Sequence, residues 1–468
     1  MRQHRIKGSA AAAALAAALL CAAVAASGQE QAPVRLSLDR AIEMGLSSDE
    51  VLRQAGQAIL AADAGVREAK SGRIPRIDLS AQYGRNILKP VLFLPSDMGE
   101  AFGGVTKIEL GEDNDISAVA AATWNLWTGG RLSAAIGASS AVADAVRSGR
   151  VATADYVKFG VREAYYGVLL AQAILRINEM AYESTAEAVR VAKAGSEQGT
   201  VARFDLLRAE VELENRRAPL LQARNELSQA LLLLKRRCGL VPETEVALSD
   251  TLDTVDDPPD LETLMEMMHG SNPELQALGH RVRAAELYLD LEKAQRWPAL
   301  QLGANYLVQG QWSNEAYPNS DQLAHSSAVT VGLTYPIFDG FKAKSRIDRA
   351  KADLRTTELE RDRMTREKEL SVRVSRLTVV DAIAALQGRR EAVGLAEEAY
   401  RLAELRLANG LATPLERLDA ELALTTARGQ FAQALYVANI AEAALELTVG
   451  GGAAPSPAGS DRKEYGDE

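Results

Sequence analysis

Two short stretches carry the charged residues most able to do chemistry, and they are copies of one another. Residues 199–211 read GTVARFDLLRAEV, and residues 410–422 read GLATPLERLDAEL. The carboxylates in these stretches are Asp205, Glu416 and Asp419. Acids in a first helical turn complement the positive end of the helix dipole. Carboxylates repeated around a symmetry axis would instead repel one another, raise each other's pKa and attract cations. Both interpretations stay open for these three acids.

The two stretches also carry the signals of a turn between helices. Gly199 and Gly410 can end a helix because glycine adopts the left-handed backbone without strain. Thr413 and Pro414 then favour a new helix, with a hydroxyl cap and a proline at the first helical position. The first copy has Ala202 in place of the threonine, so we expect its helix to be less well capped.

The motifs of the common enzyme classes are missing from the sequence. No GxxxxGK[ST], GxGxxG, HExxH or CxxC occurs, so nucleotide binding, zinc hydrolysis and thiol redox chemistry have no basis in the residues. His269, His280 and His325 do not fall at a metal-ligand spacing. We therefore expect a protein that is not an enzyme and that holds no cofactor or metal.

The N-terminus has the pattern of an exported protein. Basic residues precede an alanine- and leucine-rich run that ends in small residues, which predicts a signal peptide over residues 1–26. Cleavage there removes Cys21 and leaves Cys238 without a disulfide partner. Lipidation of Cys21 stays open, although Leu20 stands where a lipobox needs a small residue. We expect Cys238 to be a buried apolar residue.

Charge and hydropathy narrow the class of protein further. The net charge is −10 over 468 residues, and loss of the three basic leader residues makes it −13, so nucleic acid is not an expected partner. No apolar run after the leader reaches the ~18 residues that a membrane helix needs. If the chain enters a membrane, we expect it to do so as strands.

The chain is a tandem duplication. Positions 38–83 align without a gap to positions 261–306, and fourteen of the 46 are identical. Further along, WNLWTGGR at 124–131 aligns with YPIFDGFK at 335–342, at a shorter offset that the two glycine-led stretches share. We predict a first repeat over 27–238, a linker over 239–260, a second repeat over 261–450 and a disordered tail over 451–468.

Each repeat changes from a helical to a strand period and back again. Alternating apolar residues predict strands at about 76–84, 117–127, 299–309 and 327–338, each near the ten residues of a tilted membrane strand. Long proline-free segments predict helices on the order of 100 Å. Leucines recur every seven residues from Leu206 to Leu234, which favours coiled-coil packing.

The four strands have one apolar and one polar face, so they cannot close a sheet within one chain. Lipid does not tolerate open strand edges, so further copies must complete the ring. Two copies would leave an interior filled by side chains, whereas three or four would leave a lumen, which the polar face favours. Four aromatic residues are expected near strand ends as a membrane-interface belt: Tyr83, Trp124, Tyr306 and Tyr335.

The ordered pair of repeats resembles the TolC-type outer-membrane efflux protein family. The resemblance rests on LSLDRAIEMGLSSDEVL with its echo LETLMEMMHGSNPELQAL, on RIPRIDLSAQY with RWPALQLGANY, and on the two glycine-led stretches. It implies a mainly α fold in which long coiled-coil helices form an α-barrel. It also implies a homotrimer in which four strands per protomer build one shared twelve-stranded transmembrane β-barrel.

The resemblance also implies a function and partners. Such proteins are passive exit ducts of tripartite efflux or type I secretion systems. They lie in outer-membrane lipid with a large periplasmic part. Their expected partners are a periplasmic adaptor and an inner-membrane transporter of the RND or ABC type. The transported substrate and the particular pump do not follow from the resemblance.

The resemblance further implies roles for the acidic stretches at the periplasmic tip. Glu416 and Asp419 fall at positions that line the narrowest part of the pore, and Asp205 at a position that holds the tip closed. Leu407 and Ala412 replace a tyrosine and an arginine of the best-known latch, so closure must use other contacts. Arg203, beside Asp205, is a candidate for one of them.

A structural function is the alternative from a different class. The same helices could form a periplasmic coiled-coil spacer or adhesin whose strands make a closed soluble sheet without a pore. The alternating apolar strands and the aromatic residues near their ends argue against it. A requirement for detergent would distinguish the two.

Overall fold

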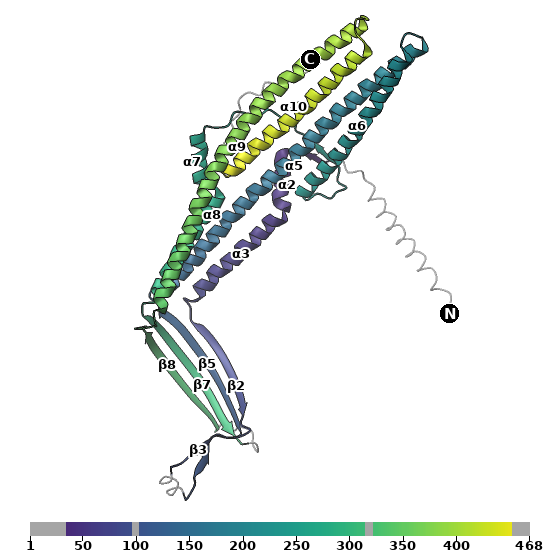
Figure 1. The fold of residues 1–468 in the computed structure, drawn as a ribbon. Coiled ribbons are helices and arrows are strands. Elements are labelled where there is room, and N and C mark those ends of the chain that lie inside the picture. Colours follow the sequence, from purple (N-terminus) through teal and green to yellow (C-terminus); the bar gives the residue numbers. More distant parts are fainter. Residues whose placement is uncertain (1–33, 96–102, 314–321, 452–468) are drawn as a thin grey trace, which may run out of the picture. The chain divides into compact units, whose positions relative to one another are not determined.

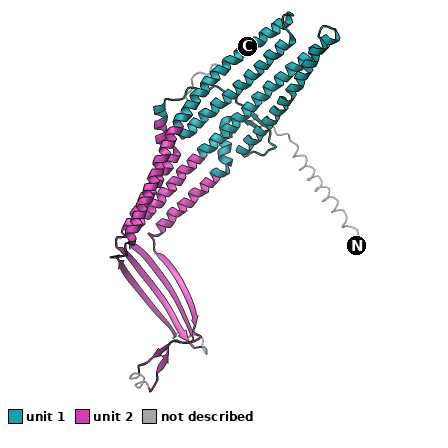
Figure 2. Ribbon diagram, in the orientation of Figure 1, with its two compact units in different colours: residues 1–52, 154–264, 372–468 teal, residues 53–153, 265–371 magenta. Residues whose placement is uncertain are grey.

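The computed structural model describes residues 34–95, 103–313 and 322–451, and the chain divides into two compact units (Figure 2). Unit 1 contains residues 1–52, 154–264 and 372–468, and unit 2 contains residues 53–153 and 265–371. Each unit therefore combines segments of both repeats. The expected signal peptide over 1–26 and all but Gly451 of the expected tail lie outside the described residues.

The helices recur in the order that the sequence repeats predict (Figure 1). The first repeat forms α2 (Leu38–Ser48), α3 (Glu50–Ser71), α5 (Arg131–Glu197) and α6 (Arg203–Arg237). The second forms α7 (Leu261–Ser271), α8 (Pro273–Ala294), α9 (Lys342–Ala408) and α10 (Pro414–Val449). The first three helices of one repeat begin and end at the residues equivalent to those of the other. The predicted tandem duplication is thus present in the fold.

The long helices need packing partners along their length. Helices α5 and α9 each have 67 residues, which corresponds to about 100 Å of helix. The heptad leucines of α6 provide one packing seam, because all of them are buried or half-buried, whereas Leu207 and Leu221 between them are exposed. The seam consists of Leu206, Leu213, Leu220, Leu227 and Leu234. None of the helices in the described ranges is long and apolar enough to cross a membrane.

Unit 2 contains an antiparallel sheet of four strands in the order β2-β5-β7-β8 (Figure 1). The strands are β2 (Arg76–Arg85), β5 (Asn114–Trp127), β7 (Ala299–Trp312) and β8 (Leu323–Thr334). The two repeats meet at the centre of the sheet, because β5 of the first repeat pairs with β7 of the second. Strands β2 and β8 lie at the two edges.

The register of this sheet places most of its large apolar residues on one face. Ile77 lies opposite Ala122, Ala122 opposite Ala304, and Ala304 opposite Val329. Residues directly opposite one another share a face, and the next position on each strand points the other way. The second face carries the polar positions, such as Asp78, Ser80, Gln82, Ser117, Thr123, Gln301, Asn305, Gln309, Ser326 and Thr330.

Three features of the strands differ from the sequence prediction. Strand β8 ends at Thr334 rather than near 338, because Pro336 has no N–H with which to continue the ladder. Between β2 and β5 the chain contains a small antiparallel pair, β3 (Val91–Phe93) and β4 (Lys107–Glu109). The linker contains β6 (Val246–Leu248), which pairs in parallel with β1 (Val34–Leu36). These three-residue strands are too short to show a period.

The core of unit 1 forms around this small parallel sheet. Tyr165 of α5 is fully buried, and its hydroxyl lies 2.8 Å from the Leu36 carbonyl oxygen and 2.9 Å from Asp250 Oδ2. Cys238 is 2% exposed and free, and burial raises the pKa of its thiol to about 11. It is therefore an unreactive apolar core residue, as the sequence predicts.

Candidate functional site

The two glycine-led stretches form matching turns between antiparallel helices of unit 1. Gly199 follows α5 with φ of +75°, and Gly410 follows α9 with φ of +70°. At the second turn, Leu411 N–H donates to the Arg406 carbonyl oxygen at 2.8 Å, and Gly410 N–H donates to Leu407 at 3.0 Å. The first turn has the same pair of bonds, which together satisfy the last carbonyls of each helix. Both turns need glycine at the left-handed position.

The helices that follow the turns start differently. The Thr413 hydroxyl accepts from the Glu416 N–H at 3.3 Å, and the Glu416 carboxylate accepts from the Thr413 N–H at 3.5 Å. This reciprocal pair is a capping box, and Pro414 occupies the first turn. Ala202 at the start of α6 provides no side-chain cap. The better capping of the second copy agrees with the sequence prediction.

Glu416 and Asp419 differ in their local partners. Glu416 Oε2 lies 3.3 Å from Arg406 Nη1, so the carboxylate is paired across the turn as well as capping the helix. Arg406 also donates to the Leu411 carbonyl oxygen at 3.2 Å. Asp419 is exposed one turn further along α10. Asp419 is thus exposed to solvent in the single chain, whereas Glu416 is paired with Arg406.

Arg203 and Asp205 are both exposed on the first turn of α6. Among the described residues, no ion pair joins either of them to another side chain. Asp205 lines a groove of about 470 Å³ between the two helical hairpins, in which Val191, Leu415 and Leu418 supply apolar walls. The role of Arg203 in closing the tip therefore stays a prediction.

A cluster that sequence reasoning missed lies beside this groove and connects three helices. Arg417 of α10 has its Nη1 atom 3.1 Å from the Tyr400 hydroxyl and 3.8 Å from Glu404 Oε1, both on α9. The same atom is 3.5 Å from the Ser184 hydroxyl on α5. One side chain therefore links the α9–α10 hairpin to the α5–α6 hairpin.

The Arg417 cluster is more buried than the exposed acids of the tip. Arg417 Nη2 lies 3.5 Å from Glu421 Oε2, and the two side chains are 14% and 7% exposed. Neither atom has a hydrogen-bond partner among the described residues. Burial, and to a lesser degree the hydrogen bond to Glu404, raises the pKa of Tyr400. The only signal in the sequence was the four-residue spacing of Arg417 and Glu421, which many exposed pairs share.

The aromatic residues expected at strand ends do not all lie there. Tyr83 lies near one end of β2, and its hydroxyl donates to Asn114 Oδ1 at 2.8 Å. Trp124 lies near the opposite end of the sheet, and Tyr335 directly follows β8. Tyr306 is in the middle of β7, opposite Ala120, because this strand is longer than predicted. The end position expected for Tyr306 is therefore wrong.

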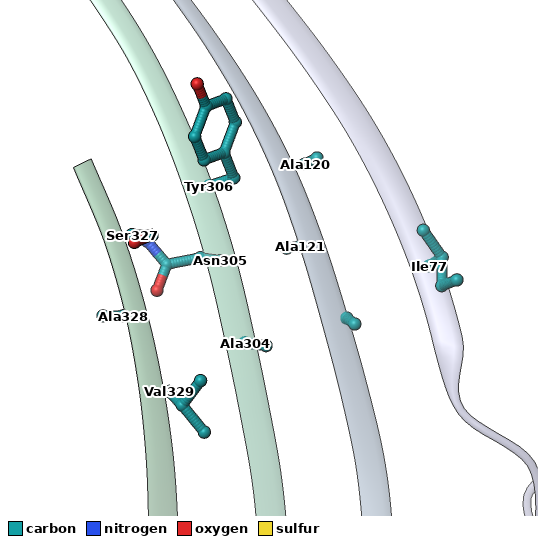
Figure 3. Close-up of a pocket in the computed structure, with 10 residues that line it drawn as sticks. Ile77, Ala120, Ala121, Ala304, Asn305, Tyr306, Ser327, Ala328 and Val329 are labelled. Carbon is teal, nitrogen blue, oxygen red and sulfur yellow. The ribbon is translucent and has the colours of Figure 1, made fainter. Parts of the chain in front are cut away.

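Small residues leave a hollow in the middle of the sheet. Alanines of β5 and β7, together with Ile77, Tyr306 and Val329, line a space of about 350 Å³ (Figure 3). The larger apolar side chains that line this hollow are strongly exposed, with Ile77 at 76% and Val329 at 74%. An apolar surface of this kind is typical of a face covered by lipid or protein.

The chain thus combines two helical hairpins that have matching turns with an open sheet that is apolar on one face. A sequence model of the family described as outer membrane efflux protein matches residues 41–240 and 264–451. The chain belongs to this family, whose members are outer-membrane transport proteins. Within the described ranges, no group of three or more histidine, cysteine or acidic residues could hold a metal ion.

Curated relatives share about a quarter of the residues. Protein CyaE of Bordetella pertussis is 27% identical over 330 residues, which covers 69% of this chain and 65% of that protein. The alkaline protease secretion protein AprF of Pseudomonas aeruginosa is 25% identical over 283 residues, which covers 59% of this chain and 57% of that protein. The match thus spans less than two thirds of either relative.

The fold also agrees with solved structures. The crystal structure of a membrane protein from Pseudomonas aeruginosa superposes with a TM-score of 0.73 at 20% identity. The superposition covers 89% of this chain and 91% of that one. The predicted fold class, mainly α with a small sheet, is confirmed.

Proposed function

We propose that this chain is the exit duct of an efflux or secretion system in the outer membrane. The observation that carries the proposal is the sheet of unit 2, which is apolar on one face, polar on the other and open at both edges. Its exposed apolar side chains suit lipid, and its polar face suits a water-filled lumen. Membership in the outer membrane efflux protein family supports the same conclusion.

The open edges make a single copy incomplete. A strand edge in lipid leaves backbone groups without partners, which costs several kcal/mol per group. We infer a homotrimer whose three sheets close into one twelve-stranded ring, since three copies leave a lumen. An adaptor in the periplasm and an inner-membrane transporter are the proposed partners, because a passive duct needs an energy source elsewhere.

The helical turns are the proposed gate at the periplasmic end. Glu416 and Asp419 would form acidic rings when copies surround one axis, and cations would be favoured in the pore. The Arg417 cluster is the proposed contact that holds the hairpins together where Leu407 and Ala412 replace the better-known latch. Asp205 and Arg203 remain candidates for contacts between copies, because both are exposed in one copy.

The named relatives point to two classes of cargo. AprF is by name a secretion protein for an alkaline protease, at 25% identity. TtgC of Pseudomonas putida is by name the outer membrane protein of a toluene efflux pump, at 24% identity. Deletion of the gene, followed by comparison of secreted proteins and of drug susceptibility, distinguishes the two classes of cargo.

Ion selectivity in a planar bilayer tests the gate. The purified protein should conduct in discrete steps and select cations, and Glu416→Gln combined with Asp419→Asn should lower that selectivity. Arg203→Ala should raise the conductance if Arg203 holds copies together, and an unchanged conductance removes it from the gate. Glu367→Gln is the control, because Glu367 is exposed, pairs with Arg363 and lies on α9 far along the helix from the turn at Gly410. Equal selectivity in the double variant and the control would contradict the acidic rings.

A further inference from the structure

The connections between the sheet of unit 2 and its helices all lie at one end of the sheet (Figure 1). Because the strands are antiparallel, this end holds the starts of β2 and β7 and the ends of β5 and β8. We define the junction as residues 73–76, 124–131, 295–299 and 334–346, which include the adjoining strand ends.

Contacts between the segments hold the junction together. Trp124 Nε1 donates to the Arg73 carbonyl oxygen at 2.9 Å, which joins β5 to the turn before β2. Arg346 Nη1 donates to Gln295 Oε1 at 2.6 Å, which joins the start of α9 to the residue after α8. Strands β5 and β7 pair between these two contacts. Charged side chains from all four segments therefore lie in one region of unit 2.

The junction is basic in a chain that is acidic overall. It contains seven basic residues and one acidic residue, whereas the whole chain has a net charge of −10. Arg76 pairs with Asp78 at 2.9 Å, and Asp339 accepts from the Ala343 N–H at 2.7 Å. The other basic residues are exposed and form no ion pair with any described residue. These junction cations are Arg73, Arg131, Arg296, Lys342, Lys344 and Arg346.

Two junction cations stand where the backbone itself disfavours them. Arg131 is the first residue of α5 and Lys342 the first of α9, and neither helix has an acidic residue in its first turn. The N-terminal end of a helix carries a partial positive charge, so a cation there is repelled. Residues that break a local rule in this way are expected where function requires them. An external anion would offset this repulsion and pair the exposed charges.

Exposed aromatic side chains accompany the cations. Trp127, Trp297 and Tyr335 are 48%, 62% and 57% exposed. Trp124 lies opposite Leu302 on the apolar face of the sheet, so the aromatic residues continue this face into the junction. Trp and Tyr side chains suit the headgroup level of a bilayer, because one part of each ring system is apolar and another is polar. An acidic protein surface would match the cations alone, whereas a lipid headgroup layer matches both features.

The opposite end of the sheet has a different charge pattern. Lys89 lies 3.2 Å from Asp113 and 3.8 Å from Glu112, so its charge is neutralised locally. Glu109 and Asp115 add further negative charge among the described residues of this end. The excess of unpaired cations is therefore specific to the end that meets the helices.

We propose that the junction cations bind the phosphate groups of anionic phospholipids in the membrane leaflet that faces the helices. The proposal rests on the proposed function, because it requires the apolar face of the sheet to lie in a bilayer. Each Lys or Arg beside an anionic leaflet favours binding by about fivefold. Phosphatidylglycerol has a net negative charge and phosphatidylcholine has none, so the two lipids distinguish charge recognition from general insertion.

Tryptophan quenching by brominated lipids tests this preference. Three of the four tryptophans lie in the junction, and Trp312→Phe removes the fourth, at the opposite end of β7. The full-length protein with this change is reconstituted into phosphatidylcholine vesicles that contain brominated phosphatidylglycerol or brominated phosphatidylcholine. We expect phosphatidylglycerol to bind at least about fivefold more tightly. Raising the salt from about 0.1 M to about 1 M should remove most of this preference, because the Debye length falls from about 10 Å to about 3 Å.

A variant without three of the cations locates the preference. Arg131→Gln combined with Lys342→Gln and Lys344→Gln should bring the two lipids close to equal binding. The same variant should not lower the melting temperature in neutral detergent, because it removes repulsion at the starts of α5 and α9. A cation with a merely structural role would instead lower the melting temperature and leave the lipid preference in place.

Three exposed cations further along α9 provide the matched control. Arg355→Gln with Arg361→Gln and Arg363→Gln removes the same charge, starting about 20 Å beyond the first residue of the helix, and should keep the preference. Equal binding of the two lipids, or a preference that survives the loss of the junction cations, would overturn the proposal. The duct would still stand if that preparation conducts in a planar bilayer. Tryptophans quenched by neither lipid would contradict the proposed function and this proposal together.

Discussion

Replacing Arg417 with methionine should destabilise α10 where Arg417 contacts α9 and α5. The change leaves the Glu421 carboxylate, whose side chain is 7% exposed, without its counter-ion. At 3.5 Å and an effective dielectric constant of about 20, the attraction lost is roughly 5 kcal/mol. Dehydration of both groups offsets much of this, and breaking a buried pair costs about 3–5 kcal/mol. We expect the variant to lose about 3 kcal/mol of stability, the lower end of this range, because Glu404 beside the pair is half-exposed to water.

Hydrogen exchange measured by mass spectrometry on peptides from α10 reports this loss. A loss of about 3 kcal/mol in the local opening free energy corresponds to roughly 100-fold faster exchange. Arg417→Met combined with Glu421→Met should restore most of the protection, since apolar residues of similar size replace the whole pair. Arg190→Met, at an exposed pair on α5, should leave exchange unchanged. Equal exchange in the Arg417 and Arg190 variants would refute the reasoning.

Two further predictions concern helix caps and pH. Thr413→Ala should destabilise the start of α10 by about 1 kcal/mol, because it removes the helix cap. Ala202→Thr should slow hydrogen exchange at the start of α6 by supplying the missing cap. Unchanged exchange at both sites would argue against the capping assignment. Burial, with Glu446 adding to it, raises the pKa of Glu442, so stability contributed by its protonated form is lost as pH rises through the raised value. Glu442→Gln should therefore raise the melting temperature at pH 8 but not at pH 4, as read by circular dichroism, and an equal change at both values would count against it.

The regular parts of the fold could be predicted because their patterns are long. The helices of 67 residues follow from proline-free segments, and the sheet follows from alternating apolar residues such as Leu79 and Leu302. The end of β8 was missed because the apolar alternation continues past Pro336, whereas backbone hydrogen bonding does not. The short strand β6 was missed because three residues carry no period.

The site was only partly predictable for a different reason. Turn chemistry is local, so Gly410 and the cap at Thr413 follow from neighbouring residues. The Arg417 cluster depends on contacts among α5, α9 and α10, and no spacing in the sequence relates Ser184 to Arg417, which are 233 residues apart. Charge pairs at helical spacing are common on exposed faces, so the buried pair could not be singled out without the packing.

The mass of the purified protein, measured with and without detergent, tests most directly whether the open sheet is completed by other copies in lipid. Exposed apolar residues on one face and two free strand edges predict a protein that needs detergent and has three times the mass of the single chain. A monomer that stays soluble without detergent would contradict the proposed duct and favour a periplasmic structural protein.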